Sequence, residues 1–346
     1  MAFYAMAMMS IAEILRRTGH RPATDLVLKF LEHFADIKRA LDDRGLWDET
    51  DGLYYDRLIT PSGEQVPLRV RSFVAILPAL AMSIVDQETI DLALVVGKRF
   101  AGLLASRPPS DSAPAGPGRL TGNDLMMGVP GERRLLLSLA GPDRLRRILT
   151  TLLDEAEFLS PHGLRALSAW HRDHPYTVSV EGYQASIDYE PAESTTPLFG
   201  GNSNWRGPIW FPVNYLVIST LERYHRFFGD ELTLEYPTGS GTQRTLGAIA
   251  ADLQDRLISI FTRGPEGHRP CFGGVALLRD DPAWRDNLIF SEYFHGDNGA
   301  GLGASHQTGW TGLIADIIRR RHGAVPSMGE ALAALFERSI ESAHDS

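Results

Sequence analysis

The feature that most constrains the fold is a spacing of apolar residues that recurs along most of the chain. Val27, Phe30, Leu31 and Phe34 fall at i, i+3, i+4 and i+7, which places them on one face of a helix. Pro22 precedes them and suits a helix start. The same pattern predicts helices around residues 7–15, 145–152, 217–224, 246–253 and 332–336, and helices are also expected over 72–85, 87–105 and 308–320. With about nine or ten helices of ordinary length, the sequence predicts an all-α fold.

One stretch of the chain differs from this helical pattern. In residues 53–71, LYYDRLITPSGEQVPLRVR, apolar Val66, Leu68 and Val70 alternate with other residues behind a Pro-Ser-Gly turn, which predicts a small β-hairpin. Residues 107–123 are rich in Pro, Gly and Ser and are expected to form a mobile surface loop. Because the segments on both sides of this loop are helical in pattern, we predict a single domain over residues 1–346.

Composition limits the partners and the compartment. The chain of 346 residues carries a net charge of -9, which argues against nucleic acid or an anionic membrane and fits a neutral ligand. A lone cysteine, Cys271, excludes an intrachain disulfide and a CxxC zinc site. Since no Asn-x-Ser/Thr sequon occurs either, we predict a reducing, cytoplasmic location. The N-terminus reads as a core helix rather than a signal peptide, and no stretch approaches the length of a membrane span.

Three long loops, at 44–56, 159–210 and 290–310, have the composition of a sugar-binding site. Four of the six tryptophans lie in or beside them: Trp47, Trp205, Trp210 and Trp310. Flat aromatic faces suit the C–H face of a sugar ring, and Arg, Asn and Gln can bind its hydroxyls. The competing interpretation is that each tryptophan only fills a helical core.

Two motifs in these loops resemble a known family. GGNSNWRGPIWFPVNYL, from residue 200, and SEYFHGDNGAGLGASHQTGW, from residue 291, are similar to the C-terminal part of the catalytic domain of glycoside hydrolase family 63, which includes processing α-glucosidase I and mannosylglycerate hydrolases. The resemblance extends to residues 45–56, 66–78, 153–168 and 188–194.

The resemblance implies an (α/α)6 barrel, or toroid, and an exo-acting hydrolase that inverts the anomeric configuration of α-glucosides or related sugars. The position of Glu292 matches the general base of the family. We expect the substrate to be bound by residues of the motif loops: Tyr55, Asp56, Asn204, Trp205, Arg206, Trp210, Tyr293, His295, His306, Gln307 and Trp310.

An inverting glycosidase also needs a general acid. In the family this is an aspartate in a Leu-Asp-Asn or Met-Asp-Asn setting, and no residue of this sequence matches it. We therefore expect the acid upstream of Met1 and a barrel that lacks its first one or two helices. Self-association, or a partner chain that completes the barrel, is a corollary. The other loop carboxylates are expected to bind hydroxyls or to be structural: Asp48, Asp51, Asp56, Asp188, Glu190, Glu193 and Asp297.

Three alternatives stay open at this point. The chain could be a non-catalytic carbohydrate-binding protein that keeps Trp205, Arg206 and Trp310, an inactive fragment, or a phosphorylase of the same barrel class. The spacing of His171, Asp173 and His174 resembles a metal motif, but a lone HxxH is usually incidental, so no metal or cofactor is predicted. A calcium site built from scattered loop oxygens would leave no readable spacing. Arg69 and Arg71 are expected to pair with nearby carboxylates, or else to bind an acidic sugar.

Overall fold

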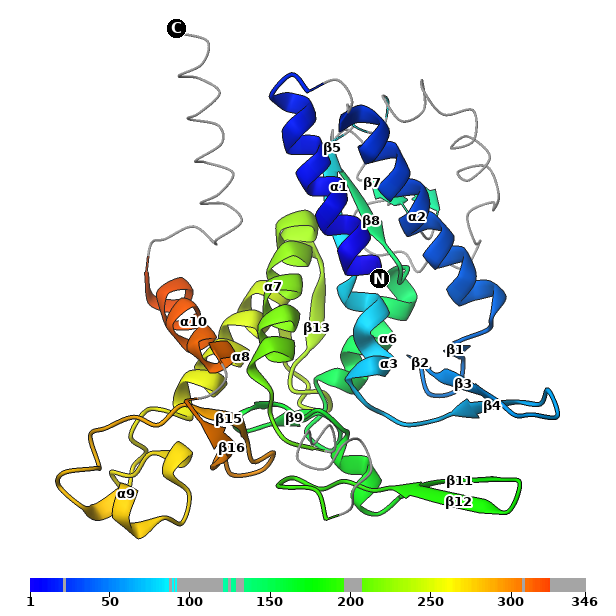
Figure 1. The fold of residues 1–346 in the computed structure, drawn as a ribbon. Coiled ribbons are helices and arrows are strands. Elements are labelled where there is room, and N and C mark those ends of the chain that lie inside the picture. The colour runs from blue at the N-terminus through cyan, green and yellow to red at the C-terminus, as the bar shows by residue number, and fades with distance from the viewer. Residues whose placement is uncertain are drawn as a thin grey trace, which may run out of the picture. The chain divides into compact units, whose positions relative to one another are not determined.

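The chain forms two compact units in a computed structural model (Figure 1). The first comprises Met1–Gly45, Ala81–Leu145 and His322–Ser346, and the second Leu46–Leu80 and Arg146–Arg321, where the sequence suggests a single domain. The structure describes residues 1–20, 23–86, 89, 91, 121–123, 126–128, 134–195, 207–306 and 309–323.

Among its described residues, the first unit contains two amphipathic helices and a sheet. Helices α1 (Ala2–Arg17) and α2 (Ala23–Asp43) lie side by side and bury Met6, Met9, Leu31 and Phe34 between them and Leu137. The sheet is antiparallel and has the order β5-β8-β7-β6, with bounds Met82–Asp86, Arg134–Ser138, Met126–Gly128 and Thr121–Asn123.

The helix expected over 72–85 is shorter than predicted, because part of that segment is a strand. Helix α3 covers only Phe73–Leu80, and strand β5 follows it. Ile84 and Val85 pair in register with Leu136 and Leu135 of β8. Periodicity cannot separate a short apolar strand from a helix, and β-branched residues favour the strand.

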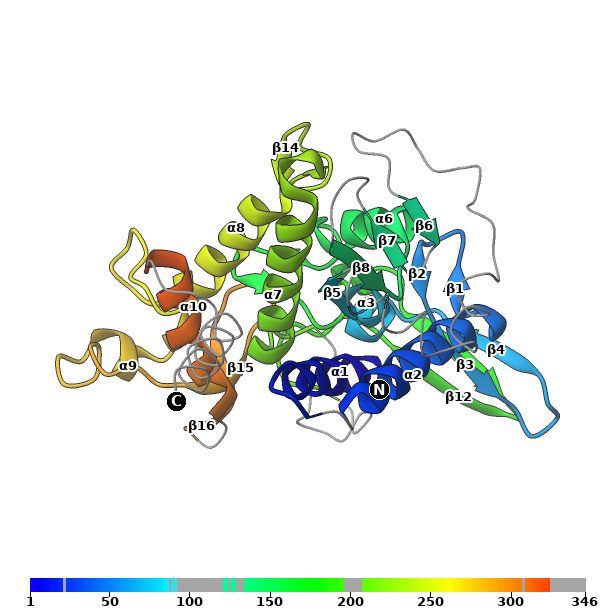
Figure 2. The same ribbon diagram turned by 90° about the horizontal axis from the view of Figure 1, so that it is seen from above.

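The second unit is built mainly from helices α7 (Phe211–Phe228) and α8 (Leu246–Ser259), which lie side by side in both views (Figures 1 and 2). Ile218, Leu221, Ile249 and Leu253 are at most 1% exposed. Thr245 caps α8 by accepting a hydrogen bond from the backbone N–H of Ala248 at 3.2 Å. The other helical segments are α9 (Ala276–Asp280), α10 (Leu313–His322) and the 3-10 turns η1 (Ala169–Arg172), η2 (Gly229–Glu231), η3 (Pro270–Phe272) and η4 (Gly309–Gly312), while α6 (Pro142–Leu152) begins in the first unit.

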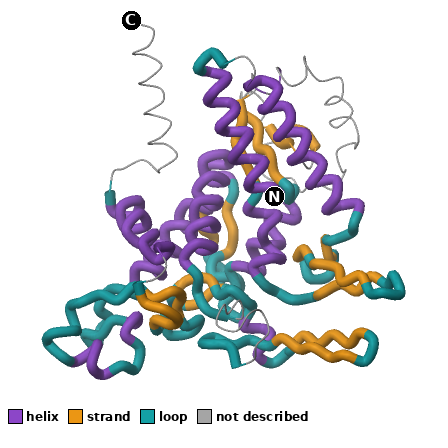
Figure 3. The backbone as a smooth tube through the Cα atoms, viewed as in Figure 1, coloured by secondary structure: helices purple, strands orange, loops and turns teal. Residues whose placement is uncertain are grey.

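The second unit also contains several short strand pairs, so the fold is helix-rich rather than all-α (Figure 3). The predicted hairpin is confirmed as β3 (Asp56–Ile59) paired with β4 (Gln65–Leu68). The other pairs were not predicted, since strands of two to five residues are too short to show alternation. They are Trp47–Asp48 with Leu53–Tyr54 (β1, β2), Leu159–Ser160 with Gly163–Leu164 (β9, β10), Tyr176–Val180 with Tyr183–Ile187 (β11, β12), Thr233–Glu235 with Gln243–Thr245 (β13, β14) and Ser291–Phe294 with Gly301–Ser305 (β15, β16).

Several predictions about the chain's course fall outside the described residues. These are the helix around 332–336, nearly all of the helix expected over 87–105, and residues 107–120 of the expected surface loop. The last residues of that loop, Thr121–Asn123, form strand β6. In the described part of the chain, no helix combines the length and the apolarity that crossing a membrane requires.

Candidate functional site

Isolated backbone bridges join four segments of the second unit that are far apart in the sequence. Ser72 pairs with Leu167, Arg165 with Ile209, and Ile209 with Phe294. The Ile209 N–H donates to the Phe294 carbonyl at 2.7 Å, and the reverse bond measures 3.0 Å. The four segments belong to the stretches 66–78, 153–168, 200–216 and 291–310, so the fold brings the quoted motifs together.

Glu292 lies in the last of these segments, at a β-bulge. The register between β15 and β16 shifts between Ser291 and Tyr293, so Glu292 has no partner in the ladder. Two residues of β16, Gly303 and Ala304, therefore lie opposite the single residue Glu292 of β15, so the bulge is in β16. The Glu292 side chain is half-buried, and its Oε2 accepts a hydrogen bond from the Ala304 N–H at 3.3 Å.

Gly303 lets the backbone pass close to this carboxylate. Its φ of +66° lies in the left-handed region, and a Cβ there would come within 2.8 Å of Glu292 Oε2 and 2.6 Å of the Tyr293 ring. The Gly303 N–H donates to Oε1 of Glu193 at 3.4 Å. Glu193 and Glu292 are therefore bound to neighbouring amides of one strand.

Two side chains of η4 bind the backbone of the Glu292 strand. The indole Nε1 of Trp310 donates to the Glu292 carbonyl at 2.7 Å, and the Thr311 hydroxyl donates to the Ser291 carbonyl at 2.6 Å. Trp310, expected to bind a substrate with its aromatic face, thus has its indole N–H bound to the backbone.

Three other residues expected to bind the substrate are buried. Trp210 and Tyr293, 3% and 0% exposed, stack with ring centroids 4.7 Å apart, and the Trp310 ring meets Trp210 edge-on at 5.6 Å. Tyr55 is 4% exposed and donates its hydroxyl to Asp51 at 2.9 Å, and burial raises its pKa above the usual value. The rings of Trp210, Tyr293 and Tyr55 therefore pack in the core, where burial of their apolar surface stabilises the fold. They are not open to a ligand in this structure.

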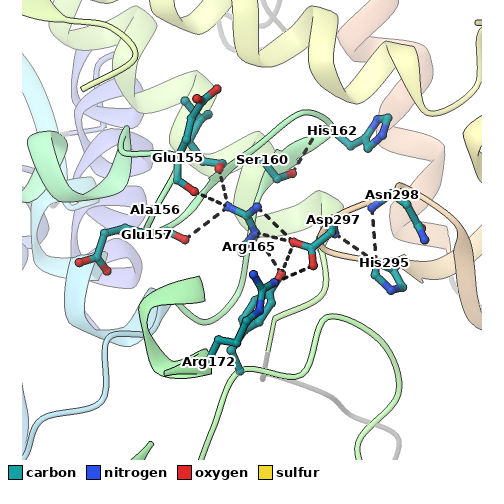
Figure 4. A network of polar contacts seen from close by, with 12 residues as sticks. Glu155, Ala156, Glu157, Ser160, His162, Arg165, Arg172, His295, Asp297 and Asn298 are labelled. Atoms are coloured by element: carbon teal, nitrogen blue, oxygen red, sulfur yellow. Dashed lines mark hydrogen bonds and ion pairs between the residues drawn. The ribbon is translucent and has the colours of Figure 1, made fainter. Parts of the chain in front are cut away.

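Asp297 is held in a network of cationic groups (Figure 4). Its Oδ1 accepts hydrogen bonds from Arg165 at 3.2 and 3.3 Å and from the Tyr189 hydroxyl at 2.7 Å, while Arg172 reaches Oδ2 at 2.9 Å. The Asp297 N–H donates to Nδ1 of His295 at 3.1 Å, and burial lowers the pKa of this imidazole. Asp297 therefore serves as an ion-pair acceptor and is poorly suited to deliver a proton.

Arg165 connects this network to the protein backbone. Its side chain is 9% exposed, and its Nη1 donates to the carbonyls of Glu155 at 3.3 Å, Glu157 at 3.4 Å and Leu159. The turn that leads into β9 and the turn after β15 are thus held by one guanidinium.

A second polar cluster surrounds Arg71, whose guanidinium pairs with Asp51 at 3.0 Å and with Glu157. Burial raises the pKa of Glu157, although Arg71 and the Ser168 hydroxyl stabilise its charged form. Arg69 pairs with Asp48 at 3.1 Å. The structure therefore supports pairing with carboxylates as the role of both arginines of the hairpin.

Both ring nitrogens of His171 are engaged in the same region. Nε2 accepts from the Arg71 N–H at 2.9 Å, so Nδ1 carries the proton that is donated to the His174 carbonyl at 2.9 Å. His171 is 1% exposed, and burial lowers its pKa. Neither nitrogen is open to a metal ion, and the described residues contain no group of three or more His, Cys, Asp or Glu that could hold one.

His171 should make the protein less stable in acid. In the folded state the pKa of His171 lies below its ordinary value of 6.5, so the unfolded chain binds a proton first as the pH falls. The contribution of neutral His171 to the free energy of unfolding is complete above about pH 6.5. It is lost as the pH falls toward the pKa of the folded state. We expect the unfolding free energy from urea titrations to drop between pH 7.5 and pH 5, and to drop less in His171→Gln. The exposed His33→Gln control should keep the wild-type pH dependence, and an unchanged slope in His171→Gln would contradict this account.

Comparisons with known proteins agree with the motif resemblance, although no family model matches the chain. The chain is 38% identical over 334 residues to an uncharacterized protein of Saccharomyces cerevisiae, covering 91% of this chain and 30% of that protein. It is 25% identical over 185 residues to a probable mannosyl-oligosaccharide glucosidase of Schizosaccharomyces pombe, covering 53% of this chain and 16% of that protein. For the mannosyl-oligosaccharide glucosidase of S. cerevisiae the identity is 22% over 178 residues, covering 51% and 15%.

The chain is glycoside hydrolase family 63-like. A crystal structure of a family 63 mannosylglycerate hydrolase from Thermus thermophilus, in complex with glucose, is also similar, with 15% identity over 88% of this chain and 43% of that chain. Its TM-score of 0.39 is too low to add to the description of the fold. The family 63-like chain spans less than a third of the length of the uncharacterized yeast protein.

Some of the expected site residues of the family 63-like chain stay predictions. Asn204, Trp205, Arg206 and Gln307 lie outside the described residues. His306 and Asp56 are exposed, and no contact in the described part of the chain assigns either a role in binding.

The sequence did not single out the residues that organise the site. Arg165 and Tyr189, which hold Asp297, and Thr311, which binds the Glu292 strand, are ordinary residues in the sequence. The only available signal was their position inside or beside the motif stretches 153–168, 188–194 and 291–310.

Proposed function

We propose that this chain carries the general base, Glu292, of an inverting, exo-acting α-glycoside hydrolase for α-glucosides or related sugars. The observation that carries the proposal is the setting of Glu292. It is half-exposed opposite a bulge, and among the described residues its carboxylate contacts a neutral amide N–H and no cationic side chain. A base that accepts a proton from water needs such a carboxylate, reachable and not neutralised by an ion pair.

Four other carboxylates in the motif segments differ from Glu292. Asp297, Asp51 and Glu157 are all tied to arginines. Glu193 is exposed but binds the amide next to the one that binds Glu292, whereas an inverting pair flanks the sugar from opposite faces about 6.5–9.5 Å apart. We infer that Glu193 binds a sugar hydroxyl and that none of these four groups is the general acid.

The reaction assigned to Glu292 transfers one proton, from the attacking water to the Glu292 carboxylate. A water molecule attacks the anomeric carbon from the face opposite the leaving group, the bond to the leaving group breaks, and Glu292 takes the water's proton. A sugar alkoxide needs a proton from an acid to leave, whereas fluoride leaves without one. Inversion follows because the displacement is single.

The wider architecture is also a proposal. We infer that the helices form part of an (α/α)6 barrel, which is supported by the helix-rich fold and by the sequence similarity to mannosyl-oligosaccharide glucosidases. Self-association, or a partner chain, stays a prediction that size-exclusion chromatography can test. Its support is the exposed apolar face of α1, where Tyr4 and Ile11 are 56% and 50% exposed.

The proposed function is tested with α-glucosyl fluoride. We expect the wild-type chain to release fluoride, with β-glucose as the first product by NMR, and Glu292→Gln to lose about 10²–10⁴-fold in rate. Glu266→Gln, a change at an exposed glutamate of another loop, is the matched control and should keep the wild-type rate. Equal rates in the two variants would remove Glu292 from the chemistry. Binding of oligosaccharides without hydrolysis would indicate a carbohydrate-binding protein instead.

A further inference from the structure

The Glu292 carbonyl lies on the edge of β15 that faces away from β16, because Phe294, two residues further on, bonds Ile209 on that edge and backbone groups alternate along a strand. Ser291 pairs with Ser305 and Tyr293 with Leu302, but Glu292 lies between these pairs. Backbone carbonyls in such positions need another donor, or they lose a hydrogen bond. The Trp310 indole N–H supplies it at 2.7 Å, a short distance for a bond of this kind.

The next residue of η4 binds the preceding carbonyl of the same strand. The Thr311 hydroxyl donates to the Ser291 carbonyl at 2.6 Å, and Thr311 is 0% exposed. Consecutive side chains of one short turn, Gly309–Gly312, therefore bind consecutive carbonyls at the bulge. Two bonds of this kind fix both the position and the rotation of the strand, which one bond would not.

The turn that carries these two donors is itself anchored to the helical scaffold. It leads directly into α10, where Asp316 accepts a hydrogen bond from the Tyr215 hydroxyl at 2.7 Å. Arg320 of the same helix pairs with Glu222. Tyr215 and Glu222 both belong to α7, so the donors are tied to the longest helix of the second unit.

We propose that Trp310 and Thr311 are positioning residues for Glu292, which hold strand β15 by two carbonyls opposite the bulge and so fix the direction of the Glu292 carboxylate. This inference rests on the proposed function, and it gives Trp310 a role different from that of a sugar platform. If the two bonds were lost, β15 would be free to shift against β16, and Glu292 Oε2 would leave the Ala304 amide that it meets at 3.3 Å. A misplacement of about 1 Å in a reacting group can cost about 10²-fold in rate.

Thr311 gives the sharper test, because a fully buried side chain cannot touch a substrate. Thr311→Val keeps the shape and removes the donor, and Thr311→Ser restores it. With α-glucosyl fluoride we expect kcat of Thr311→Val to fall about ten-fold at unchanged KM, and Thr311→Ser to recover most of it. Thr220→Val, a matched change at a buried threonine of α7, should leave kcat unchanged.

Trp310→Phe keeps a ring and removes the N–H. We expect kcat to fall about ten-fold at unchanged KM, whereas a raised KM at unchanged kcat would mean that the ring binds sugar and would overturn the inference. A lowered Tm of Thr311→Val at wild-type kcat would reduce Thr311 to a structural role and also overturn it.

A crystal structure of Thr311→Val keeps the test independent of activity. The inference predicts that the distance from Glu292 Oε2 to the Ala304 nitrogen lengthens clearly beyond 3.3 Å. An unchanged distance contradicts it even if the wild-type chain hydrolyses nothing. An inactive wild-type chain whose variant shows the shift would instead refute only the proposed function.

Discussion

We expect Gly303→Ala to hydrolyse α-glucosyl fluoride roughly 10²–10⁴-fold more slowly than the wild-type chain. This loss of rate is as large as the one expected when the base itself is removed. The added Cβ would lie 2.6 Å from the Tyr293 ring and 2.8 Å from Glu292 Oε2. Tyr293 is fully buried and stacked on Trp210, so it cannot move away. The carboxylate is the movable group, and it would be pushed off its position. Steady-state kinetics measures the loss.

Gly182→Ala separates this steric effect from backbone strain. Gly182 has a φ of +84°, comparable to Gly303, but a Cβ there would meet nothing within 4 Å. Both variants pay a conformational cost of about 1–2 kcal/mol for an L-residue in the left-handed region. Only Gly303→Ala should lose activity. Similar activity in the two variants would mean that the close approach of Gly303 to Glu292 does not matter for the chemistry.

Arg165→Met is expected to lower the unfolding free energy by about 3–5 kcal/mol, because it removes a buried cation and leaves the groups around it without their hydrogen-bond donor. The Arg165 side chain is 9% exposed, and its guanidinium binds Asp297, the Tyr189 hydroxyl and three backbone carbonyls. For a unit of this size, Tm should fall by about 10 °C. Thermal unfolding followed by circular dichroism or calorimetry gives the value.

Arg172→Met is the matched control for this variant. Arg172 also pairs with Asp297, at 2.9 Å, but its side chain is 53% exposed. An exposed ion pair contributes about 0–1 kcal/mol, so the Tm of Arg172→Met should change little. Equal destabilisation by the two variants would show that burial of Arg165 is not what makes it important.

The sequence predicted the long helices because their apolar faces repeat over many turns. Residues such as Val27, Leu31 and Phe34 on α2 are buried as the spacing requires. The short strands could not be predicted, because a pair such as Trp47 with Tyr54 covers too few residues for any period to appear. The apolar spacing places residues 82–85 in the helix expected over 72–85, and the strand could not be foreseen because its pairing partner lies about 50 residues further along the chain.

The candidate site shows the same limit. Loop composition indicated which aromatic residues lie near one another, but it could not indicate which rings other side chains would bury. Trp210 and Tyr293 are buried in the core. The partners of Asp297 could not be foreseen, because Arg165 is 132 positions away in the sequence and is brought close only by the bridges through Ile209. Glu292 stays a prediction as the base, and its bulge was invisible in the sequence.

The most direct measurement compares wild-type hydrolysis of α-glucosyl fluoride and of an α-linked glucose disaccharide, with Glu292→Gln beside it. Fluoride departs without protonation, while the disaccharide needs a general acid that we do not find in Asp297, Asp51, Glu157 or Glu193. We predict release from the fluoride alone, abolished by Glu292→Gln. Cleavage of both substrates at comparable rates, or release from the fluoride that survives in Glu292→Gln, would contradict a site that has Glu292 as its base and no acid among these carboxylates.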